Sequence, residues 1–360
     1  MEEGIQKILR TEIEKQTFPG CVVGVVDRGG ARVVVAEGAF TYDDGVPKVT
    51  PETIYDVASL TKTVVTATLA MQLVDRGTLG LDDPARAYLP EWQAKGADAV
   101  TVRHLLSHAV QFCAQRGSDI FQLALEKDKS AGEIFDAIIR APLCGPPGET
   151  FAYTNAASIL LGRIVEGVAE KPLDQLADEQ LFVPLRMQRT TFHPLDRFSK
   201  EEIVPTEDDP WRGRIIQGEV HDESAWKLSQ ERVVGSAGLF STATDLLMYL
   251  EMILKKGELR GTRYLREETV MRMGENQLTR GADAVGLGWE LNRPEIMGSD
   301  AGKVWGKTGF TGCVMFVHQR MGRAMVMLSN TIYPRRRPRA ELLERIYAPR
   351  QQLANLVFKR

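Results

Sequence analysis

The first forty residues change from a helical to a strand-like pattern of apolar positions. Isoleucine and leucine recur every three or four positions, at Ile5, Ile8, Leu9 and Ile13. This spacing predicts an amphipathic helix over residues 2 to 16, which Pro19 and Gly20 end. Two runs rich in β-branched residues follow, at 21–27 and 32–37, and the glycines between them predict a β-hairpin.

The middle of the chain has helical spacing and long loops. A helix is predicted from Ser59 to Arg76, ending at Gly77. Further helices are predicted at 101–108, 131–140, 155–169, 173–182 and 243–256. Prolines and the polar stretch 205–213 separate them.

The tail returns to short strands of mixed polarity and closes with a helix. The strands are predicted at 285–291, 303–308, 313–319 and 324–330, and the helix at 339–356. The simplest assembly is an α+β fold in which both ends of the chain share one antiparallel sheet flanked by the terminal helices. Residues 1–55 and 282–360 would form this sheet domain, residues 56–281 an inserted, mostly helical domain, and the active site the cleft between them.

Composition narrows the classes of partner. The net charge of −3 over 360 residues gives no electrostatic reason to expect nucleic acid or an anionic membrane surface. No run of about 18 apolar residues occurs, and acidic residues stand where a signal peptide would have an apolar core. The four cysteines lie far apart without a CxxC pair, which argues against a zinc site or a disulfide scaffold. We therefore expect a cytoplasmic protein, unless an export signal has been removed.

Two polar side chains at the start of an apolar helix are candidates for catalysis. Ser59 and Lys62 are three positions apart, so on a helix they share a face with Cβ atoms about 5–6 Å apart. A serine hydroxyl needs a base, and a lysine becomes one when burial and nearby cations lower its pKa. The alternative is structural: Ser59 caps the helix and Lys62 is a solvated residue of its first turn.

Two further groups join this pair. Tyr153 and Asn155 precede a helix, where their side chains can reach a cleft or can serve only as a turn residue and an N-cap. Lys307, Thr308 and Gly309 end a predicted strand. A cation, a hydroxyl and a glycine there suit an anionic group that must approach the backbone closely.

In the order S-x-x-K, Y-x-N and K-T-G, these groups resemble the penicillin-recognising serine hydrolases. The resemblance is to their class C β-lactamase-related branch, which includes esterases, D-amino-acid peptidases and muropeptide amidases. It covers most of the chain, including segments 55–62, 102–108, 220–223 and 235–242. Three places depart from the usual pattern: residues 109–112, Ser236 where histidine is frequent, and Lys307 where many esterase-like members have histidine.

The resemblance implies a role for each of these residues. Ser59 would attack a carbonyl and become acylated, while Lys62 and Tyr153 share the proton transfers. Asn155 would hydrogen-bond the substrate's acyl amide. Lys307 and Thr308 would hold a substrate carboxylate or keep the site electropositive. The N–H groups of Ser59 and Phe310 would form the oxyanion hole. No metal and no cofactor are implied.

Other signals carry less weight. Residues 302–308 lack the first glycine and the following helix of a phosphate loop. His104 and His108 have metal-pair spacing, but packing is the simpler interpretation. His221, Asp222 and Glu223 either brace the site or support its chemistry.

We therefore predict a serine hydrolase acting on a small-molecule ester, amide or β-lactam. A carboxylesterase or a D-aminoacyl amidase or peptidase is the first interpretation. A β-lactamase, a muropeptide amidase of cell-wall recycling, and a catalytically silent binding protein for penicillin or peptidoglycan fragments are the alternatives.

Overall fold

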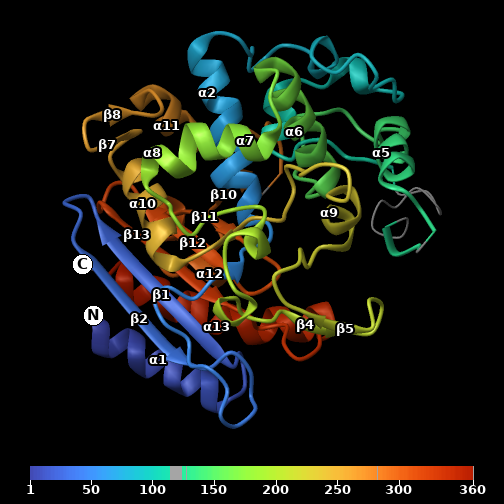
Figure 1. Cartoon of the computed structure of the whole chain (residues 1–360). Helices are drawn as coiled ribbons and strands as arrows, with labels where there is room; N and C mark the ends of the chain where they lie inside the picture. Colours follow the sequence, from blue (N-terminus) through green and yellow to red (C-terminus); the bar gives the residue numbers. More distant parts are fainter. Residues whose placement is uncertain (114–123, 127, 282, 360) are drawn as a thin grey trace.

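One seven-stranded antiparallel sheet joins both ends of the chain (Figure 1). The computed structural model describes residues 1–113, 124–126, 128–281 and 283–359. The strand order is β2-β1-β13-β12-β11-β10-β9. The bounds are β1 Gly20–Asp27, β2 Arg32–Gly38, β9 Ala284–Val285, β10 Glu290–Leu291, β11 Trp305–Thr308, β12 Val314–His318 and β13 Arg323–Ser329. The first hairpin thus pairs with the last strand, in a register that places Cys21 opposite Ser329.

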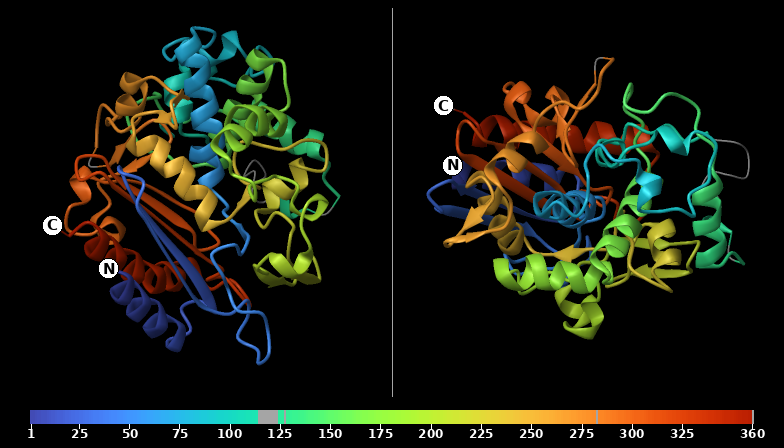
Figure 2. Two further views of the ribbon diagram at one scale, coloured as in Figure 1. Left: turned by 60° about the vertical axis from the view of Figure 1, so that its left-hand side comes forward. Right: turned by 90° about the horizontal axis from the view of Figure 1, so that it is seen from above.

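Helices cover both faces of this sheet. The terminal helices α1 (Glu2–Glu14) and α13 (Arg339–Val357) lie on one face, and α10 (Ala243–Leu254) lies on the other (Figure 2). Ile5 and Leu9 of α1 are buried in the same apolar cluster as Leu353 of α13. The predicted α+β fold, with an antiparallel sheet flanked by the terminal helices, is confirmed, and both of these helices cover the same face.

Apart from α12, the other α-helices of the described residues lie between β2 and β9. They are α2 Thr68–Arg76, α3 Val102–Leu106, α5 Ala131–Arg140, α6 Asn155–Ala169, α7 Leu173–Ala177, α8 Val183–Leu185, α9 Glu223–Leu228 and α11 Glu267–Met273, while α12 Pro294–Met297 follows β10. Three small sheets pair β3 Tyr55–Asp56 with β6 Phe240–Ser241, β4 Glu207–Asp209 with β5 Arg214–Ile216, and β7 Glu258–Leu259 with β8 Thr262–Arg263. The domain boundaries at 55/56 and 281/282 stay predictions. None of the described helices is long and apolar enough to cross a lipid bilayer.

Several elements differ from their predictions. The strand expected at 285–291 is two short strands, because the chain turns at Gly288, whose φ of +81° suits glycine and whose backbone packs against Ala67. The polar stretch 205–213 contributes to the hairpin of β4 and β5. The helix expected at 101–108 ends at Leu106, and His108 has a left-handed φ of +49°.

The cysteines require a correction. Cys113 and Cys144 form a disulfide across 31 residues of sequence, whereas Cys21 and Cys313 are free and buried. Main-chain hydrogen bonds from Cys113 to Pro142 and from Cys144 to Gln111 hold the two segments side by side. This pairing arises from tertiary packing, so the spacing of the cysteines did not reveal it.

Candidate active site

Ser59 lies in a tight turn between β3 and the helix that ends at Arg76. Ala58 before it has a left-handed φ of +47°, and its N–H donates to Asp56 Oδ1 at 2.8 Å. The first turns of the helix are wound as a π-helix from Lys62 to Ala67, a form found often at functional sites. The turn thus places the hydroxyl of Ser59 at the helix entrance, as the sequence predicted.

The ammonium nitrogen of Lys62 has three oxygen partners. Its Nζ lies 2.9 Å from Ser59 Oγ, 2.9 Å from Asn155 Oδ1 and 2.6 Å from the main-chain oxygen of Ser236. The oxygens of Asn155 and Ser236 can only accept hydrogen bonds. When Lys62 is neutral, they therefore hold its two hydrogens, and its lone pair faces the hydroxyl of Ser59.

The surroundings of Lys62 favour this neutral form. Burial and the nearby cation of Lys307 lower the pKa of Lys62 to about 7, against the opposing effects of Asp222 and Glu290. A pKa near neutrality is what a general base needs.

Tyr153 lies on the other side of Ser59. Its hydroxyl donates to Ser59 Oγ at 2.6 Å. Its ring packs at a tilt of 38° against that of His108, with 4.8 Å between centroids. The nitrogens of Lys62 and Lys307 lie 5.2 and 4.6 Å from the centroid of the Tyr153 ring. The N-cap of α6 is Thr154, which leaves the side chains of Tyr153 and Asn155 for the site.

Lys307, Thr308 and Gly309 end β11 beside the serine turn. Lys307 is 1% exposed, and its Nζ lies 3.4 Å from Oε1 of Glu290 on β10. Thr308 donates to the same oxygen at 3.2 Å. A Cβ on Gly309 would lie 2.5 Å from the main-chain oxygen of Val57, so only glycine allows this approach.

A cavity of about 230 Å³ opens next to Ser59. Tyr153, Glu290, Thr308 and Phe310 line it together with residues of α13, among them Tyr347 and Arg350. Lys307 is not among its lining residues. Within the described part of the chain, the N–H groups of Ser59 and Phe310 donate to no main-chain acceptor.

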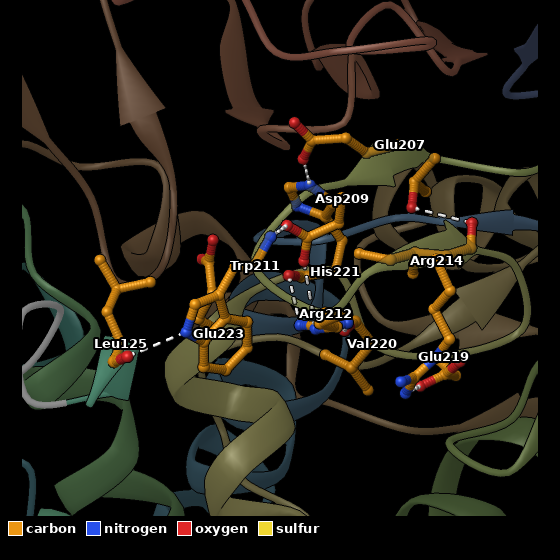
Figure 3. Close-up of polar contacts among 12 residues, drawn as sticks. Leu125, Glu207, Asp209, Trp211, Arg212, Arg214, Glu219, Val220, His221 and Glu223 are labelled. Atoms are coloured by element: carbon orange, nitrogen blue, oxygen red, sulfur yellow. Dashed lines mark hydrogen bonds and ion pairs between the residues drawn. The ribbon is translucent and has the colours of Figure 1, made fainter. Parts of the chain in front are cut away.

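A network of charged side chains supports the segment from Val220 to Glu223 (Figure 3). His221 Nε2 lies 2.8 Å from Glu207 Oε2, and Arg336 forms ion pairs with both Glu207 and Glu223. The ring of His221 stacks under Phe310 with centroids 5.6 Å apart. Arg336, from the arginine-rich stretch that precedes α13, therefore contributes a partly buried cation to this network.

The structure thus brings Ser59, Lys62, Tyr153 and Asn155 into direct contact and places Thr308, Gly309 and Phe310 around them. Sequence reasoning missed Glu290 and the main-chain contact of Ser236 with Lys62. The sequence did offer a signal for Glu290, because a single acidic residue in the apolar strand predicted at 285–291 indicates a buried charge with a partner. Ser236 acts through its main-chain carbonyl, which any residue there would provide. His104 and His108 do not share a helical face, because the helix ends between them.

Curated relatives match most of the chain. An N-acetylmuramyl-L-alanine amidase of Bacillus subtilis (strain 168) is 29% identical over 351 residues, covering 87% of this chain and 77% of the relative. A protein of Escherichia coli (strain K12) is 31% identical over 309 residues, covering 79% of this chain and 70% of the relative. Its name gives it, provisionally, as a D-alanyl-D-alanine carboxypeptidase.

The fold and a family model agree with these relatives. An octameric penicillin-binding protein homologue from Pyrococcus abyssi superposes with a TM-score of 0.75 at 22% identity, covering all of this chain and 78% of the other. The family model described as Beta-lactamase matches residues 5–348. The chain therefore belongs to the beta-lactamase family and is a serine hydrolase.

Proposed function

We propose that the chain hydrolyses an ester or amide through an acyl-enzyme on Ser59. The observation that carries this proposal is the double contact of Ser59 Oγ, with Lys62 Nζ at 2.9 Å and with the Tyr153 hydroxyl at 2.6 Å. One neighbour can take the proton of the serine while the other relays it to the leaving group.

In acylation, neutral Lys62 accepts the proton of Ser59 as the hydroxyl oxygen attacks the substrate carbonyl. The N–H groups of Ser59 and Phe310 then stabilise the oxyanion, and each such donor contributes about 3–4 kcal/mol in other acyl-transfer enzymes. The proton passes through Tyr153 to the departing alcohol or amine. In deacylation, Tyr153 takes a proton from the attacking water as it passes its own proton to Lys62. Lys62 then returns a proton to Ser59 Oγ when the tetrahedral intermediate collapses.

The natural substrate we propose is an amide of a peptidoglycan fragment. The support comes from the two relatives, whose names give a muramyl-alanine amide and a D-alanyl-D-alanine peptide as substrates. A simple carboxylic ester is the second candidate. It is favoured because Lys307 and Thr308 are both engaged by Glu290, so a substrate carboxylate is not needed to complete their contacts.

The test uses Ser59→Ala with Ser299→Ala, an exposed serine, as the matched control. Turnover of p-nitrophenyl acetate should fall by several orders of magnitude in Ser59→Ala and stay unchanged in the control. Intact-mass spectrometry during turnover should show an acyl adduct on the peptide that contains Ser59. An adduct on another residue would overturn the assignment.

A panel of substrates then separates the alternatives. It contains p-nitrophenyl esters, D-aminoacyl anilides, a chromogenic cephalosporin and muropeptides. Fastest turnover of muropeptides supports the proposed natural substrate, whereas fastest turnover of the esters or the cephalosporin contradicts it. Stable labelling of Ser59 without turnover of any compound would instead identify a binding protein.

A further inference from the structure

The orientation of the Asn155 side chain is determined by chemistry. Lys62 Nζ lies 2.9 Å from Asn155 Oδ1. A charged lysine can only donate hydrogen bonds, so the atom of Asn155 that faces Lys62 must be the amide oxygen. Asp222 Oδ2, 2.9 Å away on the other side, is a carboxylate oxygen and must face the amide nitrogen. The opposite rotamer would place donor against donor and acceptor against acceptor.

Both hydrogens of the Asn155 amide have acceptors within the protein. One is directed to Asp222 Oδ2, and the other to Ser224 Oγ at 3.1 Å. Ser224 in turn donates to Asp222 Oδ1 at 2.6 Å. A substrate carbonyl would have to displace one of these partners to receive a hydrogen bond from Asn155.

Asp222 is itself held firmly. Its Oδ1 accepts from the N–H of Ala225 at 2.8 Å and so caps α9. Burial opposes its ionisation, but hydrogen bonds from Ser224 and Ala225 and the charge of Lys62 bring the pKa of Asp222 below its ordinary value. The carboxylate is thus ionised in the range where the enzyme would work.

The chain around Asp222 is built to hold its position. Arg212 donates to the main-chain oxygens of Val220 at 2.7 Å and His221 at 3.0 Å (Figure 3). Its guanidinium lies over the ring of Trp226. The N–H of His221 donates to Asp56 Oδ2 at 2.8 Å, while Oδ1 of the same carboxylate holds the turn of Ser59. Asp56 therefore ties this segment to the nucleophile.

We propose that Asp222 is a positioning residue, which holds Asn155 so that its amide oxygen aligns Lys62 with Ser59. Asn155 then serves Lys62 and not the substrate, in contrast to the role that the family resemblance implies. A substitution that breaks this alignment should accordingly slow substrates with and without an acyl amide alike. This inference rests on the proposed role of Lys62 as the base.

The test is Asp222→Asn, because an asparagine keeps the shape of the side chain and an oxygen that can cap α9. Its amide group would meet that of Asn155 donor to donor, so the alignment of Lys62 should be lost. We expect the maximal kcat/KM for p-nitrophenyl acetate, measured at high pH, to fall by roughly 10- to 100-fold. In an Asn155→Ala background, the same substitution should change this maximum by less than about twofold, because the two residues act as one unit.

The pH profile provides the second readout. The charged and aromatic groups that face Lys62 are Asp222, Glu290, Lys307, His108 and Tyr153. Removing the negative charge of Asp222 lowers the pKa of Lys62, so the acid limb of kcat/KM should move to lower pH. The control Asp245→Asn removes a different buried carboxylate, one that contacts Arg189 and Thr190, and should leave the limb unchanged.

Two results would overturn the inference. One is an unchanged acid limb in Asp222→Asn, and the other is a loss of rate that multiplies with that of Asn155→Ala. Either would mean that Asp222 is only a helix cap. If Ser59 is not acylated in the wild type, the proposed function fails instead, and the two failures are thus distinguishable.

Discussion

Replacing Lys307 by methionine removes a buried cation that acts on the candidate base. Lys62 and Lys307 lie 5.2 and 4.6 Å from the centroid of the same Tyr153 ring, so their nitrogens are less than about 10 Å apart. After burial, Lys307 is the largest influence that lowers the pKa of Lys62. Methionine has a similar volume and no charge, so the fold should tolerate it better than alanine.

The size of the effect follows from Coulomb's law. Two unit charges about 8 Å apart interact by about 2 kcal/mol at an effective dielectric constant of about 20, which corresponds to about 1.5 pKa units. Glu290, 3.4 Å from Lys307, also loses one of its two cationic neighbours and keeps Arg293, and its negative charge raises the pKa of Lys62 in the same direction. Because only neutral Lys62 accepts the proton of Ser59, kcat/KM should rise with pH through a limb near pH 7 in the wild type. In Lys307→Met this limb should move upward by roughly one to two units, which lowers the rate at neutral pH by roughly 5- to 50-fold.

The assay is kcat/KM against pH for a neutral p-nitrophenyl ester and for a matched ester that carries a carboxylate. Lys303→Met, which removes an exposed lysine of the same segment, is the control and should behave as the wild type. Equal shifts for both esters are expected, because Lys307 is buried behind Glu290. An unchanged limb refutes the electrostatic argument. A loss confined to the anionic ester would show that Lys307 binds a substrate carboxylate, as the family resemblance implies.

Three other perturbations test separate parts of the site. Tyr153→Phe removes the hydroxyl 2.6 Å from Ser59 Oγ and should slow deacylation more than acylation. Burst kinetics should therefore show a retained burst and a slow steady state. A steady-state rate equal to that of the wild type would exclude Tyr153 from proton transfer. Gly309→Ala would press a Cβ against Val57 and should lower stability by about 1–3 kcal/mol together with activity, whereas Gly302→Ala, with open space around it, should change neither in thermal unfolding and ester assays. Cys113→Ser with Cys144→Ser should lower the free energy of unfolding by about 3–4 kcal/mol, as the loop of 31 residues predicts, and equal denaturation midpoints would contradict this. Thiol trapping in cells would also test our expectation of a cytoplasmic location, because such a disulfide persists in oxidising compartments.

Local patterns in the sequence were sufficient for the fold class, and the resemblance of three short motifs to a known family added the type of chemistry. The hairpin of β1 and β2, the terminal helices and the strands of the tail follow from apolar spacing over a few neighbouring residues. The spacing of Ser59 and Lys62 likewise placed both side chains at one helix entrance, because positions three apart on a helix are neighbours in any tertiary context.

The tertiary structure decided which partners these residues meet. Lys62 contacts Asn155 and Ser236 across 93 and 174 residues of sequence, and no local pattern encodes those pairings. The same holds for the disulfide between Cys113 and Cys144 and for the pairing of Lys307 with Glu290 across adjacent strands. The pKa of Lys62 near 7 results from burial and from charges on several separate segments. The sequence alone therefore determined which groups could react, whereas packing determined their protonation and alignment, because burial and electrostatic fields arise only when distant segments come together.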